Sequence, residues 1–83
     1  MAVAAPATGR VIAITGPVVD IEFPAGQLPA IFNAVEIELG TGEPLVCEVQ
    51  QHLGNNWVRA VAMTTTDGLA RGAVAHDTGA ATA

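Results

Sequence analysis

The stretch from Gly9 to Phe23, GRVIAITGPVVDIEF, constrains the fold more than any other part of the chain. From Val18 to Phe23, apolar side chains occupy the odd positions and acidic side chains the even positions after Val18. A period of two is that of a half-buried strand, not of a helix. Gly16 and Pro17 separate this run from an earlier apolar one and are typical of a turn. The stretch therefore predicts an antiparallel β-hairpin with one face in a core.

The same signals recur along the chain at intervals of roughly ten residues. Further strands are predicted over Ala34–Leu39, Leu45–His52, Trp57–Met63 and Leu69–Val74, with turns at Gly40–Pro44, Leu53–Asn56 and Thr64–Gly68. The loop Pro24–Asn33 is expected to pack over one end of the sheet through its apolar residues, which are Leu28, Ile31 and Phe32. This pattern predicts a small all-β barrel or sandwich, and closure into a barrel is favoured because it removes exposed strand edges.

With 83 residues, the chain is expected to be one domain or a piece of a larger protein. The predicted organisation is a flexible lead-in over residues 1–8, a β-barrel over residues 9–76 and an exit linker over residues 77–83. Hydrophobic residues make up 51% of the chain and charged residues only 13%. A small core and so few charges predict that some apolar surface is left for a partner to cover.

The charge balance argues against several classes of partner. The net charge is −5, the chain has no lysine, and its only basic residues apart from histidine are Arg10, Arg59 and Arg71. Nucleic acids and anionic membrane surfaces are bound largely through clustered Lys and Arg, so neither is an expected partner. Cys47 is the only cysteine, which excludes an internal disulfide. No apolar run reaches the ~18 residues of a transmembrane helix, and no membrane insertion is expected.

Several catalytic and ligand-binding motifs are absent from the sequence. Without lysine, no glycine-rich phosphate loop of the GxxxxGK[ST] type exists. Without serine, a Ser-His-Asp triad is excluded. His52 and His76 lie far apart in the sequence and lack the spacing of a zinc site.

Three weaker candidates each have a structural alternative. Cys47 and His52 could form a nucleophile pair, but strand alternation favours Cys47 as an apolar core residue. Glu36 and Glu38 could act as an acid/base pair, but they are more typical of a solvated strand face. Asp67, before a glycine, is interpreted as a turn former and not as a base.

The predicted strand Trp57–Met63 differs from the others because it is apolar on both sides. One face holds small apolar residues, and the other holds the candidate subunit-interface residues, which are Trp57, Arg59, Val61 and Met63. A strand that is apolar on both sides is usually covered on both sides. In so small a domain the second cover is expected to be another chain. Arg59 is then either an interface anchor or a member of a surface salt bridge.

The order and spacing of several short strings resemble the start of the β subunit of F-type ATP synthases. These strings are Gly16-Pro17-Val18-Val19-Asp20, Leu28-Pro29-Ala30-Ile31, Asn33-Ala34, Glu48-Val49, Gln51-His52-Leu53-Gly54, Val58-Arg59, Ala62-Met63, Thr66-Asp67-Gly68-Leu69, Arg71-Gly72 and Asp77-Thr78-Gly79-Ala80. The resemblance covers about Gly9 to Ala80. The strings QHLG, VRxxAM and TDGL favour the β subunit over its sister α subunit. Cys47 stands where a larger aliphatic residue is common, and Ala81-Thr82-Ala83 departs from the usual continuation.

The resemblance implies a closed six-stranded antiparallel barrel, the N-terminal domain of that subunit. It implies barrels that alternate with those of α subunits in a crown, which holds the hexamer together and supports ATP synthesis and hydrolysis elsewhere. Mg-ATP or Mg-ADP would bind the parent subunit, in a nucleotide domain that this chain lacks, and no catalytic, cofactor-binding or metal residue is carried over. The resemblance also implies that the parent subunit contacts the rotary stalk. It implies a peripheral location, on the cytoplasmic face of the bacterial inner membrane or on the matrix side of the mitochondrial inner membrane.

A competing hypothesis is a stand-alone small β-barrel binding module, such as an oligonucleotide-binding fold. Those barrels need aromatic platforms and positive charge. Only 4% of this chain is aromatic and its balance is acidic. The composition therefore argues against this hypothesis.

Overall fold

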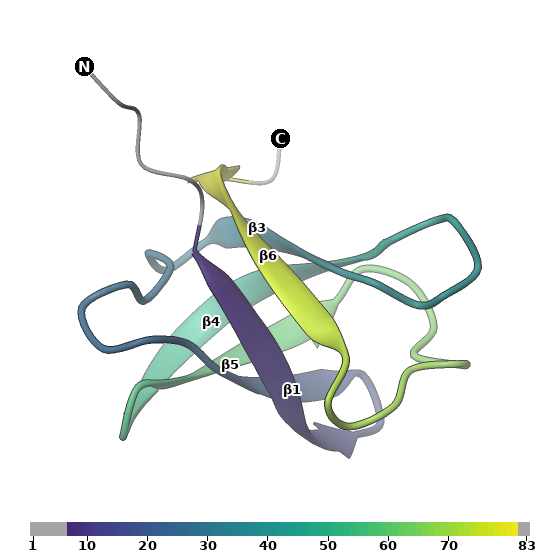
Figure 1. Ribbon diagram of the computed structural model, residues 1–83, viewed down its shortest axis with the longest axis horizontal. Helices are drawn as coiled ribbons and strands as arrows, with labels where there is room; N and C mark the ends of the chain where they lie inside the picture. Colours follow the sequence, from purple (N-terminus) through teal and green to yellow (C-terminus); the bar gives the residue numbers. More distant parts are fainter. Residues whose placement is uncertain (1–6, 82–83) are drawn as a thin grey trace.

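A computed structural model describes residues 7–81, which form an all-β barrel of six strands (Figure 1). The strands are β1 (Thr8–Thr15), β2 (Val18–Glu22), β3 (Asn33–Ile37), β4 (Leu45–Gly54), β5 (Trp57–Ala62) and β6 (Val74–Ala81). The described residues contain no helix. The prediction of a closed six-stranded antiparallel barrel is confirmed.

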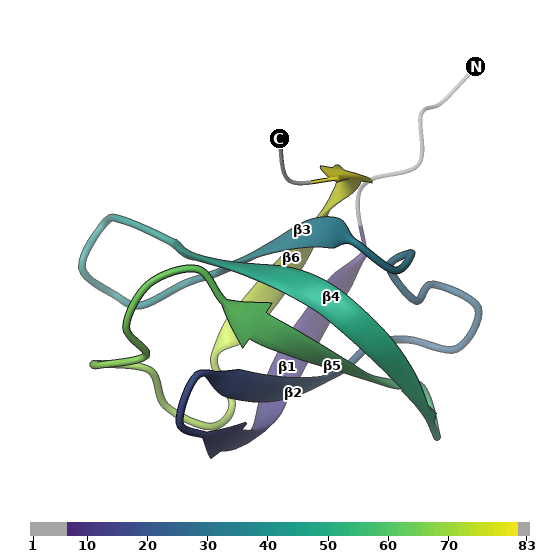
Figure 2. The same ribbon diagram turned by 180° about the vertical axis from the view of Figure 1, so that it is seen from behind.

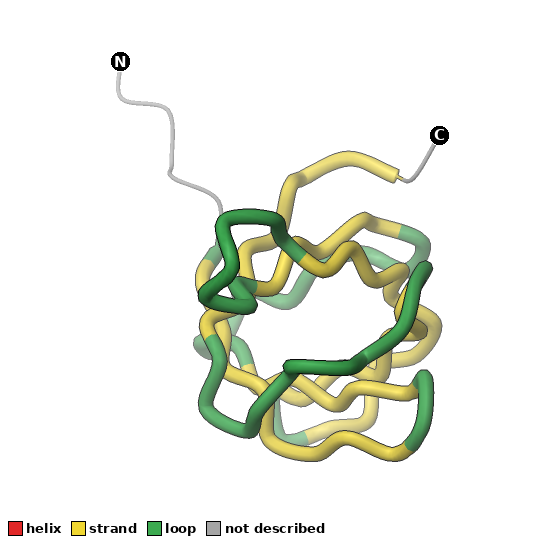
Figure 3. Tube along the Cα trace, turned by 90° about the vertical axis from the view of Figure 1, so that its right-hand side faces the viewer, coloured by secondary structure: helices red, strands yellow, loops and turns green. Residues whose placement is uncertain are grey.

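The barrel closes in the order β1-β2-β5-β4-β3-β6, and every neighbouring pair is antiparallel. Figure 3 looks into the ring that the strands form. The chain closes on itself where the first strand pairs with the last, through Thr8 opposite His76 and Gly9 opposite Ala75. No long strand edge is therefore left unpaired, which is how closure avoids edge-to-edge association.

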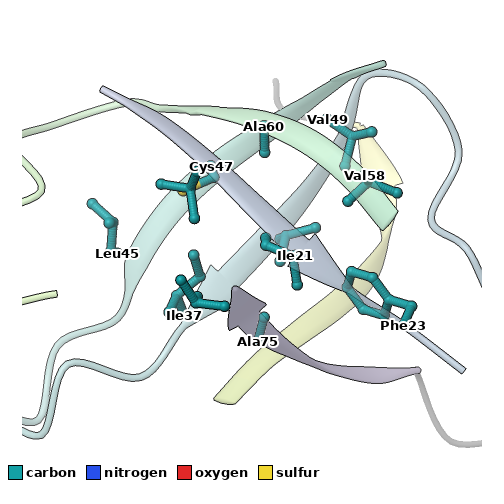
Figure 4. Packing of buried hydrophobic residues seen from close by; sticks show 12 residues of the cluster. Ile21, Phe23, Ile37, Leu45, Cys47, Val49, Val58, Ala60 and Ala75 are labelled. Carbon is teal, nitrogen blue, oxygen red and sulfur yellow. The ribbon is translucent and has the colours of Figure 1, made fainter. Parts of the chain in front are cut away.

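The core consists of inward side chains from all six strands, as the period of two requires. Twelve apolar residues are buried: Val11, Val19, Ile21, Phe23, Val35, Ile37, Leu45, Cys47, Val49, Val58, Ala60 and Ala75. Figure 4 shows them converging on the barrel interior. No polar or charged residue in the described part of the chain is buried. Apolar packing therefore stabilises the barrel interior, and the polar and charged side chains of the described residues lie on its outer surface.

The opening hairpin forms where the sequence predicts it. β1 and β2 pair from Arg10 opposite Glu22 to Thr15 opposite Val18, with a bulge near Val11. Gly16 has a φ of 55°, and the ring of Pro17 fixes the next φ near −65°. A glycine at positive φ in the first position of a two-residue loop is typical of the turns that join antiparallel strands.

The loop between β2 and β3 covers one end of the barrel only in part as expected. Leu28 packs against the core and Pro29 is fully buried. Ile31 and Phe32, expected to pack inward, are exposed. The backbone N–H of Phe32 donates to the Val49 carbonyl at 2.7 Å, and Phe32 has a φ of 73°. Phe32 is thus held in a left-handed conformation, which is rare for a bulky residue and which the sequence pattern did not indicate.

The last strand lies later than predicted. The expected strand Leu69–Val74 is mainly loop, and β6 begins at Val74. Asp77–Ala81, predicted as part of the exit linker, are paired in β6, with Asp77 opposite Val35 and Ala81 opposite Asn33. Pairing with both β1 and β3 forms this strand despite its weak apolar pattern. Of the predicted lead-in, Thr8 is already part of β1; residues 1–6, like residues 82–83 of the predicted linker, lie outside the described part.

Candidate functional site

The outward side chains of β2, β5, β4 and β3 form one continuous surface, called here the outer wall. Figure 2 shows these four strands side by side. Strand registers place Val18 opposite Val61, Val61 opposite Glu48, and Glu48 opposite Ala34. The four predicted interface residues of the fifth strand all belong to this wall, since their inward neighbours Val58 and Ala60 are fully buried.

One end of the outer wall is polar, and its groups bond to one another within the chain. Arg59 donates to Asp20 twice, from Nε to Oδ1 at 3.0 Å and from NH2 to Oδ2 at 3.2 Å. The hydrogen bond to Asp20, followed by the attraction of its carboxylate, raises the pKa of Arg59 above its ordinary value. Trp57 Nε1 donates to Glu22 Oε2 at 3.3 Å. Arg59 therefore forms the surface salt bridge that the sequence left as one of two alternatives.

The other end of the outer wall is apolar. Val18, Val46 and Val61 are half-buried, and Met63 is 51% exposed. Met63 follows the end of β5, and its N–H donates to the Val46 carbonyl at 2.9 Å, which continues the β4–β5 pairing. The predicted interface residues thus divide into a self-paired polar end and an apolar end that the described residues leave open.

A shallow groove of about 670 Å³ crosses the apolar end. It is lined by Ala34, Glu36, Pro44, Val46, Met63, Thr64, Thr78 and Ala81. Glu36 is the only charged residue in this lining. Its volume exceeds that of a single side chain and most of its lining residues are apolar, so it can receive a protruding side chain of a neighbouring molecule.

The alternative nucleophile pair is not assembled. Cys47 is fully buried in the core, and desolvation raises the pKa of its thiol from 9.0 to about 11. His52 is occupied elsewhere, since its Nε2 lies 2.7 Å from the Pro29 carbonyl oxygen, which can only accept a hydrogen bond. A buried, protonated thiol is a poor nucleophile, and the interpretation of Cys47 as a core residue is confirmed.

The acidic candidates also lack a catalytic arrangement. Glu36 and Glu38 are both exposed, as a solvated strand face requires. Glu38 Oε2 lies 2.5 Å from Nε2 of His76 on the neighbouring strand β6. Asp67 is exposed in a turn, where its N–H bonds to Thr65 Oγ1 at 3.2 Å. Within residues 7–81, no cluster of three or more histidine, cysteine or acidic residues could hold a metal ion.

The groove and the division of the outer wall were not predicted from the sequence. Alternation placed Met63 on the same face as Trp57, but it carried no information on Val46, Ala34 or Ala81. These residues meet Met63 only because β4, β3 and β6 are neighbours in the closed barrel. The only sequence signal for this apolar end was that Val18 and Val46 occupy outward strand positions, where the alternation of apolar and polar residues would place polar side chains.

No helix in the described part of the chain is long and apolar enough to cross a membrane. The family described as "ATP synthase alpha/beta family, beta-barrel domain" matches residues 11–79, which is most of the chain and includes strands from all parts of the barrel. The match agrees with the observed architecture of a closed β-barrel. The chain therefore belongs to the ATP synthase alpha/beta family, and this membership implies an alpha/beta hexamer context in the peripheral F1 part of an ATP synthase.

Proposed function

We propose that this barrel is the N-terminal crown domain of a catalytic β subunit, and that it packs through its outer wall against the barrel of a neighbouring α subunit. The observation that carries the proposal is the apolar end of the outer wall, around Val61 and Met63, on a barrel of this family. Assembly into a ring needs side-by-side contacts between barrels, and partly exposed valine and methionine side chains supply apolar area for such contacts. The strings QHLG, VRxxAM and TDGL support the assignment to the β subunit.

In this proposal the barrel is an assembly element and carries no chemistry of its own. ATP synthesis and hydrolysis, with Mg-ATP or Mg-ADP, would take place in the nucleotide domain of the parent subunit. The parent would contact the rotary stalk and lie on the cytoplasmic face of the bacterial inner membrane, or on the matrix side of the mitochondrial one. The continuation of the reading frame tests this: a glycine-rich loop that ends in Gly-Lys-Thr is expected beyond Ala83, and a stop codon after Ala83 would contradict it.

The interface is tested by Val61→Asp and Met63→Asp in the full-length subunit, mixed with its α subunit. Both side chains point out of the barrel, so a charge there is expected to leave the fold intact and to reduce the fraction of assembled hexamer. Ala70→Asp, in an exposed loop outside the outer wall, introduces the same charge and serves as the control. Native mass spectrometry measures the assembly, and circular dichroism of each variant verifies that the barrel is folded. Normal hexamer yield in both outer-wall variants would refute the proposed interface.

Subunit identity needs a separate measurement. The tagged full-length subunit is mixed with purified α or β subunits, and the proportions in the complex are counted by native mass spectrometry. A β-type subunit is expected to alternate with α subunits and to leave added β subunits unbound. If the tagged subunit instead alternates with β subunits and leaves added α subunits unbound, the barrel is of the α type.

A further inference from the structure

Among the residues that the structure describes, the groove at the apolar end of the outer wall has one charged group, and that side chain has no partner in the described part of the chain. Glu36 is exposed on β3, opposite Val46 on one side and His76 on the other. Its side chain makes no hydrogen bond or ion pair within residues 7–81. His76 instead contacts Glu38. The Glu36 carboxylate therefore borders the groove with its hydrogen-bonding capacity available.

The lining of the groove combines apolar surface with one carboxylate, which suits a long basic side chain. Met63, Val46 and Pro44 offer apolar surface that leads toward the Glu36 carboxylate. Arginine and lysine bury their methylene stems along such surface and keep their charged head at a polar group. An aliphatic side chain would fit the walls equally well but would desolvate Glu36 without pairing it, which is unfavourable.

Carboxylates outnumber basic groups around the groove. Beyond Glu36 the surface continues into a second hollow of about 360 Å³, lined among others by Glu38, Glu43 and His76. The charged residues of the four outer-wall strands are four carboxylates and one guanidinium, Asp20, Glu22, Glu36, Glu48 and Arg59. Since Arg59 is bonded to Asp20, the wall as a whole has a negative balance. A positively charged surface is therefore the complementary partner.

From these observations we infer that the groove binds an arginine or lysine side chain of the neighbouring barrel, whose stem packs on Met63 and Val46 and whose head pairs with Glu36. The inference deepens the proposed function and rests on it. A second copy of this chain is a poor occupant, because the net charge of −5 on each copy opposes their association. The acidic wall thus attracts a barrel with a basic surface and repels a second copy of this chain. Charge complementarity of this kind determines which partner is bound.

The test uses the full-length subunit and its α subunit, with the dissociation constant measured at about 50 mM and about 500 mM salt, where screening lengths differ severalfold. Glu36→Gln keeps the shape and removes the charge. It is expected to weaken binding about three- to tenfold at low salt and to flatten the salt dependence. Glu36→Arg is expected to weaken binding further. Asp67→Asn, which removes a charge from an exposed turn outside the groove, is the matched control and is expected to retain both the affinity and its salt dependence.

The outcomes separate this inference from the proposed function. If Val61→Asp and Met63→Asp prevent assembly while both Glu36 variants retain wild-type affinity and salt dependence, the interface stands and the basic side chain is excluded. If the Val61 and Met63 variants assemble normally, the proposed function itself fails. Self-association of the isolated full-length subunit that Glu36→Gln abolishes would show a second copy as the occupant and overturn the inference.

Discussion

Arg59 and Asp20 form a two-pronged ion pair across strands β5 and β2, with N–O distances of 3.0 and 3.2 Å. The two residues are directly opposite in the register of these strands, although they lie 39 positions apart in the sequence. Two of the five guanidinium N–H groups and both carboxylate oxygens of Asp20 are already engaged in this pair, so this end of the wall offers a neighbouring subunit fewer unsatisfied groups. The apolar end of the outer wall has exposed apolar area that the described residues do not cover, which is why the interface is placed there.

The ion pair is expected to contribute only modestly to stability, because the Arg59 side chain is 45% exposed to solvent and salt, although Asp20 is 17% exposed. We expect Asp20→Asn and Arg59→Gln each to lower the urea midpoint slightly. In a double-mutant cycle the coupling should be favourable at low salt and decrease toward zero at high salt. A large coupling that survives high salt would contradict this account of an exposed pair.

Cys47 gives the chain an unusual pH dependence. With no lysine and no tyrosine, Cys47 is the only side chain expected to titrate between pH 9 and 11. Burial raises its pKa from 9.0 to about 11, so in this range the unfolded chain loses the proton while the folded chain retains it. Stability is therefore complete below pH 9 and decreases by about 2 to 3 kcal/mol as the pH rises to 11. Urea unfolding at several pH values measures the slope, which should vanish in Cys47→Ala.

Gly9 is required by a close approach of the backbone and not by its torsion angles. A Cβ at this position would lie 2.5 Å from the Glu22 carbonyl oxygen and 3.0 Å from the Phe23 ring. The carbonyl belongs to the paired strand β2 and cannot move without disturbing the sheet. Gly9→Ala is expected to reduce the unfolding free energy by about 2 kcal/mol or more.

Gly16→Ala is the comparison for Gly9→Ala. No atom lies within 4 Å of a Cβ at Gly16, and only its φ of 55° is unfavourable for alanine. Its expected loss is about 1 kcal/mol, the typical penalty of a left-handed residue. If the two variants have the same urea midpoint, the explanation that a Cβ at Gly9 clashes with the neighbouring strand is wrong.

The inward and outward faces should respond differently to truncation. Ile37 is fully buried, and Ile37→Ala is expected to destabilise the chain by about 2 to 5 kcal/mol through lost burial and a cavity. Val61 lies on the outer wall, and Val61→Ala is expected to change stability by less than about 1 kcal/mol. Chemical denaturation of the 83-residue chain compares the two. Equal losses would mean that Val61 belongs to the core and not to the proposed interface.

Local sequence patterns predicted the parts of the barrel that depend on neighbours along the chain. Alternation located β2, β3 and the start of β5, and glycine with proline located the first turn. The position of β6 could not be predicted in this way, because its apolar residues are small and its pairing partners, β1 and β3, are distant in sequence. Its bulge around Gly79, with a φ of 76°, further obscures the pattern.

The same limit applies to the candidate site. The sequence identified the outward face of the fifth strand, because apolar residues on both sides of a strand are a local signal. It could not identify the Arg59–Asp20 pair or the groove at Met63, since both depend on which strands become neighbours when the barrel closes. Only the closed topology separates a self-paired polar end from an apolar end that a partner can cover.

If another subunit covers the apolar end of the outer wall, assembly must protect Met63 from oxidation. Met63 is 51% exposed in the isolated barrel, and sulfoxide formation follows solvent access. The full-length subunit, alone and in the assembled hexamer, is treated with hydrogen peroxide, and the Met63 peptide is quantified by mass spectrometry. We expect oxidation of Met63 to be at least several-fold slower in the hexamer than in the isolated subunit. Equal rates in the two states would show that Met63 remains exposed in the assembly and would contradict the proposed interface.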